Sequence, residues 1–150
     1  MVACKGAAMD ILGIDIGGSG IKGAIVDVTT GEFKSERHRL ETPEGARPDD
    51  VAKTVAQVVQ LLAYQGPVGI GFPAIVIHGE CYSAANIDSE WVGLNVNSVV
   101  GRQVGMPVYT VNDADAAGVA EMRFGVGRDL GKGVVIMLTL GTGIGSAVFT

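Results

Sequence analysis

Short apolar runs separated by glycine-rich turns dominate the sequence, and this pattern predicts an α/β protein. Isoleucine, leucine and valine cluster over residues 11–16, 21–28, 68–72, 107–111 and 134–140, which predicts five β-strands. The last of these runs is apolar enough to predict a buried strand. Because the segments between strands are short or helical in pattern, we expect a mixed sheet flanked by helices.

Three segments show helical patterns. Val51, Val55, Val58 and Leu62 form one apolar stripe, so we expect a helix that opens at Asp49 and ends before the Gly66-Pro67 pair. A second helix over 96–104 has Asn95 as its expected cap and Gly105 as its stop, and a third, alanine-rich helix runs over 114–124. A charged strand over 33–40, a loop over 41–47 and a short strand over 75–77 complete the expected elements.

The residues from Asp10 to Val28 read as a β-hairpin with a glycine-rich tip, Gly17-Gly18-Ser19-Gly20. Glycine can take positive φ, and consecutive N–H groups in such a turn can form a concavity that binds anions. We therefore assign phosphate binding to these four residues and to Lys22. Asp15 precedes the tip and is the candidate ligand for Mg²⁺, which prefers one or two carboxylates together with phosphate oxygens.

Other readings of this glycine cluster are possible. The segment from Gly18 to Gly23 spells G-x-G-x-x-G, but a dinucleotide fingerprint requires a helix next, and residues 24–28 have a strand pattern. The P-loop pattern G-x-x-x-x-G-K-[ST] is absent from the sequence. A plain tight turn remains open for an isolated hairpin of this kind.

Residues 138–149 again have the pattern of a strand, a loop and a strand, and the loop contains Gly141-Thr142-Gly143. Asn112-Asp113 lies between this second hairpin and the first one. This ordered set resembles the superfamily of sugar kinases, actin and chaperone ATPases. More narrowly it resembles the ROK family of sugar kinases, and within it the polyphosphate-dependent glucokinase branch. The resemblance implies an actin-like ATPase (ribonuclease H-like) lobe, followed by the first hairpin of a second lobe.

Within this resemblance, several residues acquire roles. Pro73 and Ala74 would floor the sugar pocket, Asn86 and Asn112 would bind sugar hydroxyls, and Asp113 would contact the sugar and act as the general base. The resemblance also implies phosphate binding by Gly141, Thr142 and Gly143. From the residues alone, Asn112, Asp113 or Asp115 could equally cap the helix that follows. Trp91, the only tryptophan, is expected in the core.

The function that the resemblance implies is transfer of a phosphoryl group from polyphosphate or ATP to the 6-hydroxyl of glucose or a similar hexose, with Mg²⁺. Three alternatives stay open: an ATP-dependent ROK hexokinase, a sugar-responsive ROK regulator without its DNA-binding domain, and a nucleotide-switch ATPase. Only nine residues precede Asp10, too few for a helix-turn-helix domain, which disfavours the regulator.

Composition narrows the possible partners. Of 150 residues, 47% are hydrophobic and 18% charged, which predicts a folded domain. The net charge of −5 argues against a nucleic-acid partner or an anionic membrane surface, and no apolar run has a membrane-spanning length. Two cysteines, Cys4 and Cys81, predict reduced thiols, and the absence of a secretory signal pattern predicts a cytoplasmic location.

We expect four segments: a disordered leader (1–9), a sugar-kinase lobe (10–124), a glycine-rich hinge (125–133) and the start of a second, incomplete lobe (134–150). A chain that ends on a newly begun sheet predicts a fragment of a longer protein, a truncated sequence, or two copies that pair. The apolar strand over 134–140 would then offer an edge for association, and we expect a homodimer.

Overall fold

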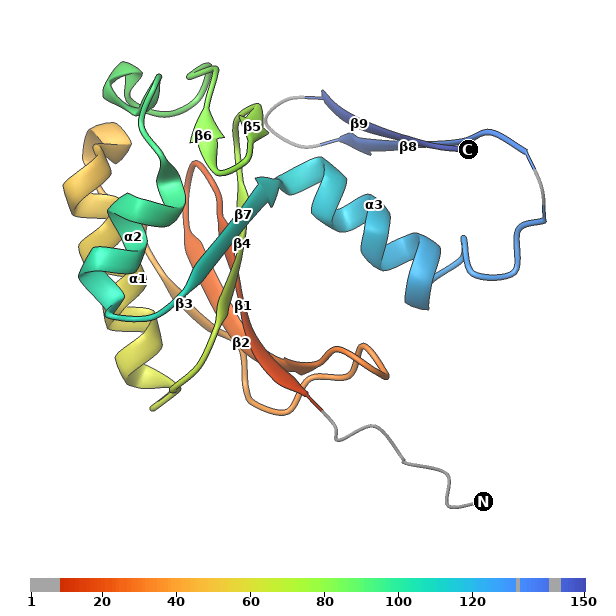
Figure 1. Ribbon diagram of the computed structural model, residues 1–150, viewed down its shortest axis with the longest axis horizontal. Helices are drawn as coiled ribbons and strands as arrows, with labels where there is room; N and C mark the ends of the chain where they lie inside the picture. The colour runs from red at the N-terminus through yellow and green to blue at the C-terminus, as the bar shows by residue number, and fades with distance from the viewer. Residues whose placement is uncertain (1–8, 132, 141–143) are drawn as a thin grey trace.

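The centre of the computed structural model, which describes residues 9–131, 133–140 and 144–150, is a five-stranded mixed sheet (Figure 1). The strands lie in the order β3-β2-β1-β4-β7. In chain order, the elements are β1 (Asp10–Ile16), β2 (Ile21–Asp27), β3 (His38–Leu40), η1 (Glu44–Ala46), α1 (Pro48–Leu61), β4 (Val68–Phe72), β5 (Val76–Ile77), β6 (Glu80–Cys81), η2 (Ser89–Trp91), α2 (Val96–Val104), β7 (Val108–Asn112), α3 (Asp113–Phe124), β8 (Val135–Leu140) and β9 (Ile144–Phe149). Of the expected leader only Met9 is described, and Gly141-Thr142-Gly143 lies outside the described residues.

The pairing of the strands confirms a mixed sheet. β1 is antiparallel to β2 and parallel to β4, which is in turn parallel to β7. β3 pairs antiparallel with β2 and forms one edge of the sheet. Because β1, β4 and β7 run in one direction, their carboxyl ends meet at one edge, where α/β proteins bind ligands.

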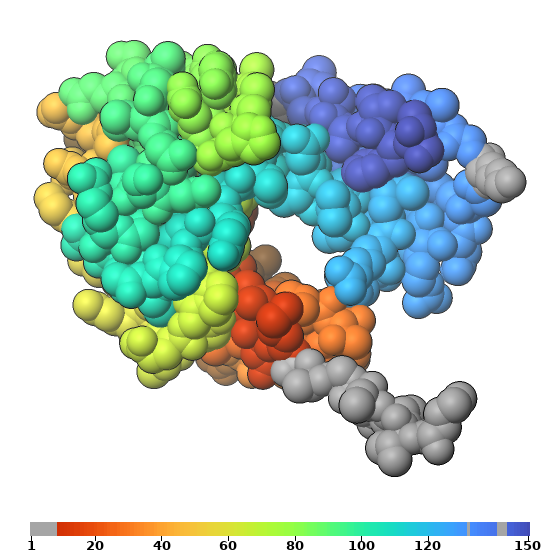
Figure 2. All heavy atoms as spheres, viewed as in Figure 1, coloured from red at the N-terminus to blue at the C-terminus, as the bar shows by residue number. Residues whose placement is uncertain are grey.

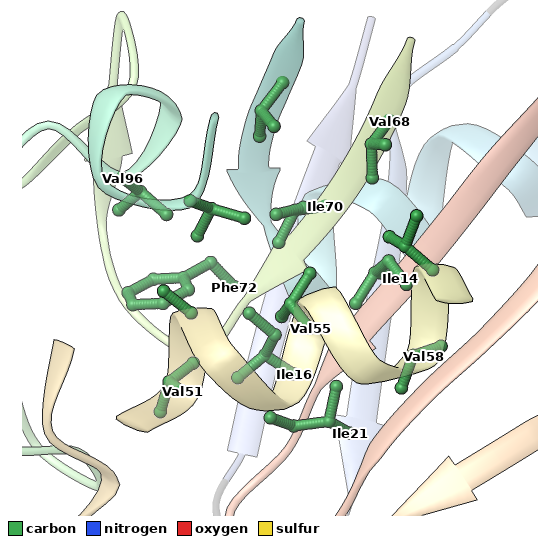
Figure 3. Packing of buried hydrophobic residues seen from close by; sticks show 14 of the residues in the cluster. Ile14, Ile16, Ile21, Val51, Val55, Val58, Val68, Ile70, Phe72 and Val96 are labelled. Carbon is green, nitrogen blue, oxygen red and sulfur yellow. The ribbon is translucent and has the colours of Figure 1, made fainter. Parts of the chain in front are cut away.

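Helices α1 and α2 cover one face of this sheet and enclose the core (Figure 3). The expected stripe on α1 is buried: Val51, Val55 and Val58 have no exposed surface. They pack against the strand residues that point to the same face, including Ile14 and Phe72. Each such side chain contributes ~1.5–3 kcal/mol through burial, so this face accounts for much of the lobe's stability.

The opposite face of the sheet is more open. α3 leaves the end of β7 on this side, and the β8–β9 hairpin packs on α3 (Figure 1). A side chain at Gly118 of α3 would lie 2.7 Å from the ring of Phe149, so glycine is needed there for the hairpin to approach. A hollow remains between α3 and the first strands (Figure 2).

Two expected boundaries differ from the structure. The strand expected over 33–40 is ordered as a strand only at His38–Leu40, because Phe33 makes a single bridge to Val26. α1 begins at Pro48, one residue before the expected start at Asp49, since proline at the first helical position needs no N–H partner.

The strand over 134–140 was expected to be buried, and this expectation is wrong. Ile136, Leu138 and Leu140 are exposed, because β8 has β9 as its one partner strand among the described residues and turns its other face toward α3. The division into lobe, hinge and second lobe stays a prediction. No helix in the described ranges has the length and apolar character that a membrane crossing requires.

Candidate active site

One cleft at the carboxyl ends of the parallel strands gathers most of the predicted site. It has a volume of about 780 Å³. The predicted residues that line it are Asp15, Gly17, Gly18, Pro73, Ala74, Asn86, Asn112 and Asp113. Asp115 lines the same cleft, as do residues of the β8–β9 hairpin such as Thr139 and Ser146. Segments far apart in the sequence therefore meet where a small polar ligand would fit.

Asn112 is the N-cap of α3. The sequence had left open whether Asn112, Asp113 or Asp115 caps this helix. The Oδ1 atom of Asn112 accepts hydrogen bonds from the N–H groups of Ala114 at 2.9 Å and Asp115 at 3.2 Å. Its Nδ2 donates to the carbonyl of Ala74 at 2.9 Å. The capping requirement is thus met by Asn112, and Asp113 is left for another role.

Asp113 lies at the first position of α3, exposed to the cleft. Its Oδ1 accepts a hydrogen bond from the N–H of Ala114 at 2.8 Å, and Oδ2 has no hydrogen-bond partner in the described part of the chain. The backbone of Asp113 lies against Gly71, where an added Cβ would be 3.6 Å from its Cα. Asp113 can therefore accept a proton from a ligand in the cleft.

Asp15 flanks the same glycine from the other side. It is the register partner of Gly71 in β4 and of Lys22 in β2. Its Oδ2 lies 3.3 Å from the Lys22 ammonium in an exposed ion pair. Because Gly71 has no side chain, the space between Asp15 and Asp113 stays open.

The setting of Asp15 fits a magnesium ion held by one carboxylate and by ligand phosphates. Its side chain is 54% exposed and lies on the cleft, and one of its oxygens is free of the ion pair. No three His, Cys, Asp or Glu side chains group as metal ligands within the described residues. The donor set thus matches Mg²⁺ only if the phosphates of a substrate complete the coordination.

The glycine tip differs from the expected anion concavity. None of Gly17, Gly18 and Gly20 takes a positive φ, and the N–H of Gly17 donates to the Gly20 carbonyl at 3.0 Å. Glycine is required at position 20 for another reason: the guanidinium of Arg39 lies where a Cβ would be. This arrangement uses the N–H of Gly17 within the turn and leaves the N–H groups of Gly18, Ser19 and Gly20 as the tip's candidate phosphate donors.

Two side chains that the sequence analysis did not single out hold this tip in place. Thr42 donates from Oγ1 to the Gly17 carbonyl at 2.6 Å, and Arg39 donates from Nη2 to the Ser19 carbonyl at 2.6 Å. Ser19, Gly20 and Lys22 are not among the residues that line the cleft. The register of the short strand β3, which places Arg39 beside the tip, has no clear signal in the sequence.

The loop that carries Asn86 is fastened at both ends. Ser83 accepts a hydrogen bond at Oγ from the N–H of Ile75, which fixes the floor beside Pro73 and Ala74. Cys81 donates its S–H to the Ser83 carbonyl at 3.1 Å, and burial raises the pKa of this thiol. Trp91 is fully buried, as expected, and its Nε1 donates to the Ala46 carbonyl at 2.9 Å.

The sheet order, the parallel strands and the cleft at their carboxyl ends define an actin-like ATPase lobe of the sugar-kinase type. The crystal structure of inorganic polyphosphate/ATP-glucomannokinase from Arthrobacter sp. strain KM superposes with a TM-score of 0.89 at 47% identity, over 93% of this chain and 57% of that one. A ROK family glucokinase from Streptomyces griseus, solved with glucose and AMPPNP, gives a TM-score of 0.80 at 32% identity, over 93% of this chain and 44% of that one.

The sequence comparison leads to the same group. The family model described as "ROK family" matches residues 11–150, so the chain belongs to the ROK family. Polyphosphate glucokinase of Mycobacterium tuberculosis is 50% identical over 137 residues, which cover 91% of this chain and 51% of that protein. The chain thus spans about half the length of the curated relatives that it matches.

Proposed function

We propose that the protein is a glucokinase that transfers a phosphoryl group from polyphosphate or ATP to the 6-hydroxyl of glucose. The observation that carries this proposal is the geometry around Gly71, where Asp113 and Asp15 face one open space in the cleft. A base on one side and a metal-binding carboxylate on the other are what phosphoryl transfer to a hydroxyl requires. The names of the ROK relatives support the substrate class.

In this proposal each group in the cleft has one task. Asp113 accepts the proton of the 6-hydroxyl as its oxygen attacks the terminal phosphorus. A new O–P bond forms, the bridging P–O bond breaks, and the shortened donor leaves as the anion. Asn86 and the floor at Pro73 and Ala74 orient the sugar, and the glycine tip holds donor oxygens, with Gly18 as its residue on the cleft whose N–H is free for them. Asn112 positions the floor and the helix, with one N–H left for a sugar hydroxyl.

The proposal includes Mg²⁺ beside Asp15, where it would neutralise charge on the transferred phosphoryl group. Gly141, Thr142 and Gly143 would bind phosphate from the second hairpin, as the family resemblance implies. A homodimer is a further part of the proposal, supported by the exposed apolar side chains on β8 and β9, and light scattering would measure it. A cytoplasmic location stays a prediction.

The test is formation of glucose 6-phosphate by the purified full-length protein, with polyphosphate and with ATP, alongside an intact mass of the same sample. We expect turnover that requires both a phosphoryl donor and glucose and that stops when EDTA removes Mg²⁺. Donor hydrolysis that is indifferent to every hexose would contradict the proposal and would favour a nucleotide-switch ATPase.

A further inference from the structure

The peptide group that joins Ala74 to Ile75 in the floor of the cleft is held by a side chain at each end. Its carbonyl accepts a hydrogen bond from Nδ2 of Asn112 at 2.9 Å, and its N–H donates to Oγ of Ser83 at 2.9 Å. All four residues line the cleft. The C=O and N–H of a trans peptide group point in opposite directions, so Asn112 and Ser83 lie at opposite ends of this part of the floor.

The backbone around Ser83 is fixed as well. The Cys81 thiol donates to the Ser83 carbonyl at 3.1 Å, and the N–H of Tyr82 donates to the Ile75 carbonyl at 2.8 Å. These bonds continue the antiparallel pairing of β5 with β6, and β5 lies beside the end of β7 (Figure 1). The Ser83 hydroxyl is therefore held in place before a ligand arrives, which reduces the entropy lost when it binds one.

The bond from Ile75 uses only part of the hydrogen-bonding capacity of Ser83. A serine hydroxyl has one O–H donor and two lone pairs, and the Ile75 N–H occupies one lone pair. Within the described ranges, the O–H of Ser83 donates to no protein acceptor. Because Ser83 is half-buried and lines the cleft, a ligand in the cleft is the partner within reach of this donor.

We propose that Ser83 contacts the hexose directly, donating its O–H to one of the hydroxyls on C1 to C4, and so helps to determine which sugar is bound. This assignment rests on the proposed phosphoryl transfer, which places the 6-hydroxyl beside Asp113. Asn112 adjoins Asp113, and Ser83 lies at the other end of the floor peptide, so Ser83 meets a different hydroxyl. A site that hydrogen-bonds a substrate hydroxyl discriminates against the analogue that lacks it.

The direct test is calorimetric titration of the full-length protein, without a phosphoryl donor, with glucose and with its 1-, 2-, 3- and 4-deoxy analogues. Ser83→Ala is compared with the parent protein and with Ser89→Ala, the same substitution at an exposed serine that does not line the cleft. We expect Ser83→Ala to bind glucose about fivefold to tenfold more weakly, because one hydrogen bond to the sugar is lost. The Kd for glucose of Ser89→Ala should stay within about twofold of the parent value.

The pattern over the analogues separates a sugar contact from mere support of the floor. The parent protein should bind the analogue that lacks the contacted hydroxyl about fivefold more weakly than glucose, whereas Ser83→Ala should bind that analogue and glucose within about twofold of each other. Ser83→Thr keeps the hydroxyl and should show the parent pattern. If Ser83→Ala weakens the binding of glucose and of all four analogues by one common factor, the proposal is overturned, because Ser83 then acts only through the floor.

The two proposals can fail separately. If one analogue shows this coupling with Ser83 but glucose is never phosphorylated, the sugar contact stands and the proposed function does not. If glucose is phosphorylated and no analogue shows the coupling, the function stands and the contact does not. A full-length protein that binds none of these sugars would overturn both.

Discussion

Asn112 donates a hydrogen bond from Nδ2 to the carbonyl of Ala74 at 2.9 Å, and through this bond the cap of α3 also holds the floor of the cleft. The same amide accepts the N–H groups of Ala114 and Asp115 at its oxygen. The Asn112 side chain therefore links Asp113 to the floor loop, in addition to the backbone pairing of β4 with β7. An amide suits this place because it offers a donor and an acceptor together.

Replacing Asn112 by aspartate should separate these two tasks. Asn112→Asp keeps an oxygen that can accept the N–H groups of the helix cap. It replaces the Nδ2 donor with a second oxygen, which repels the Ala74 carbonyl, so the floor loop should shift. We expect a KM for glucose raised about tenfold, the effect of one lost buried hydrogen bond and its unsatisfied partner. Asn112→Ala loses the cap as well and should also lower the stability by ~1 kcal/mol. Equal glucose KM values in the parent protein and Asn112→Asp would contradict this.

Gly71 should tolerate a methyl group but not a branched side chain. An added Cβ meets Asp113 and Ala116 at ordinary contact distances of 3.6–3.9 Å, so Gly71→Ala should stay within about threefold of the parent kcat. The further methyl groups of valine would press on Asp113, and we expect Gly71→Val to lower kcat at least tenfold.

The matched control for this pair is Gly69→Val, in the same strand and on the same face. There a Cβ meets only the Leu12 carbonyl oxygen at 4.0 Å. Steady-state kinetics and thermal melting of the three variants would test the claim. A Gly71→Val enzyme with normal kcat would show that the space between Asp15 and Asp113 is not used.

Asp27 should govern part of the acid stability. The carboxyl is buried and accepts a hydrogen bond from the N–H of Thr29 at 2.8 Å. This bond lowers the pKa of Asp27, and the N–H of Thr30 and the Lys34 ammonium lower it further. Burial acts in the opposite direction. A lowered folded pKa gives stability that is fully present above the unfolded value of about 3.9 and is lost as the pH falls through the folded value.

We therefore expect Asp27→Asn to lower the Tm by several degrees at pH 7 and to flatten the loss of stability below about pH 4. The control is Asp129→Asn, at an exposed aspartate whose one ion pair among the described residues is with its neighbour Arg128. Thermal melts from pH 7 to pH 2.5 provide the comparison. Parallel curves for the parent protein and Asp27→Asn would contradict the assignment.

Local patterns in the sequence predicted most elements of the fold. Asn95 and Gly105 bound α2 as expected, because capping chemistry is read from neighbouring residues. The apolar stripe of α1 was equally clear. The burial of β8 was predicted wrongly, because whether an apolar strand is covered depends on partners distant in the sequence.

The candidate site was predicted in outline and missed in its supports. The positions of Asp15 and Asp113 at strand ends follow from the alternation of strands and helices. The contacts of Thr42 and Arg39 with the tip depend on the register of β3, a strand of three residues. The reason for glycine at position 20 was likewise not local, since the guanidinium that lies against it comes from another strand.

The central claim is that Asp113 takes the proton of the sugar hydroxyl, and Asp115 provides its matched control. Both aspartates line the cleft in the first turn of α3, but only Asp113 lies over Gly71 beside Asp15. The decisive measurement is kcat for glucose phosphorylation, with the Kd for glucose, in Asp113→Asn and Asp115→Asn of the full-length protein. We predict a loss of kcat of at least a hundredfold in Asp113→Asn with glucose still bound, and a change within about threefold in Asp115→Asn. Near-normal turnover in Asp113→Asn would contradict the account.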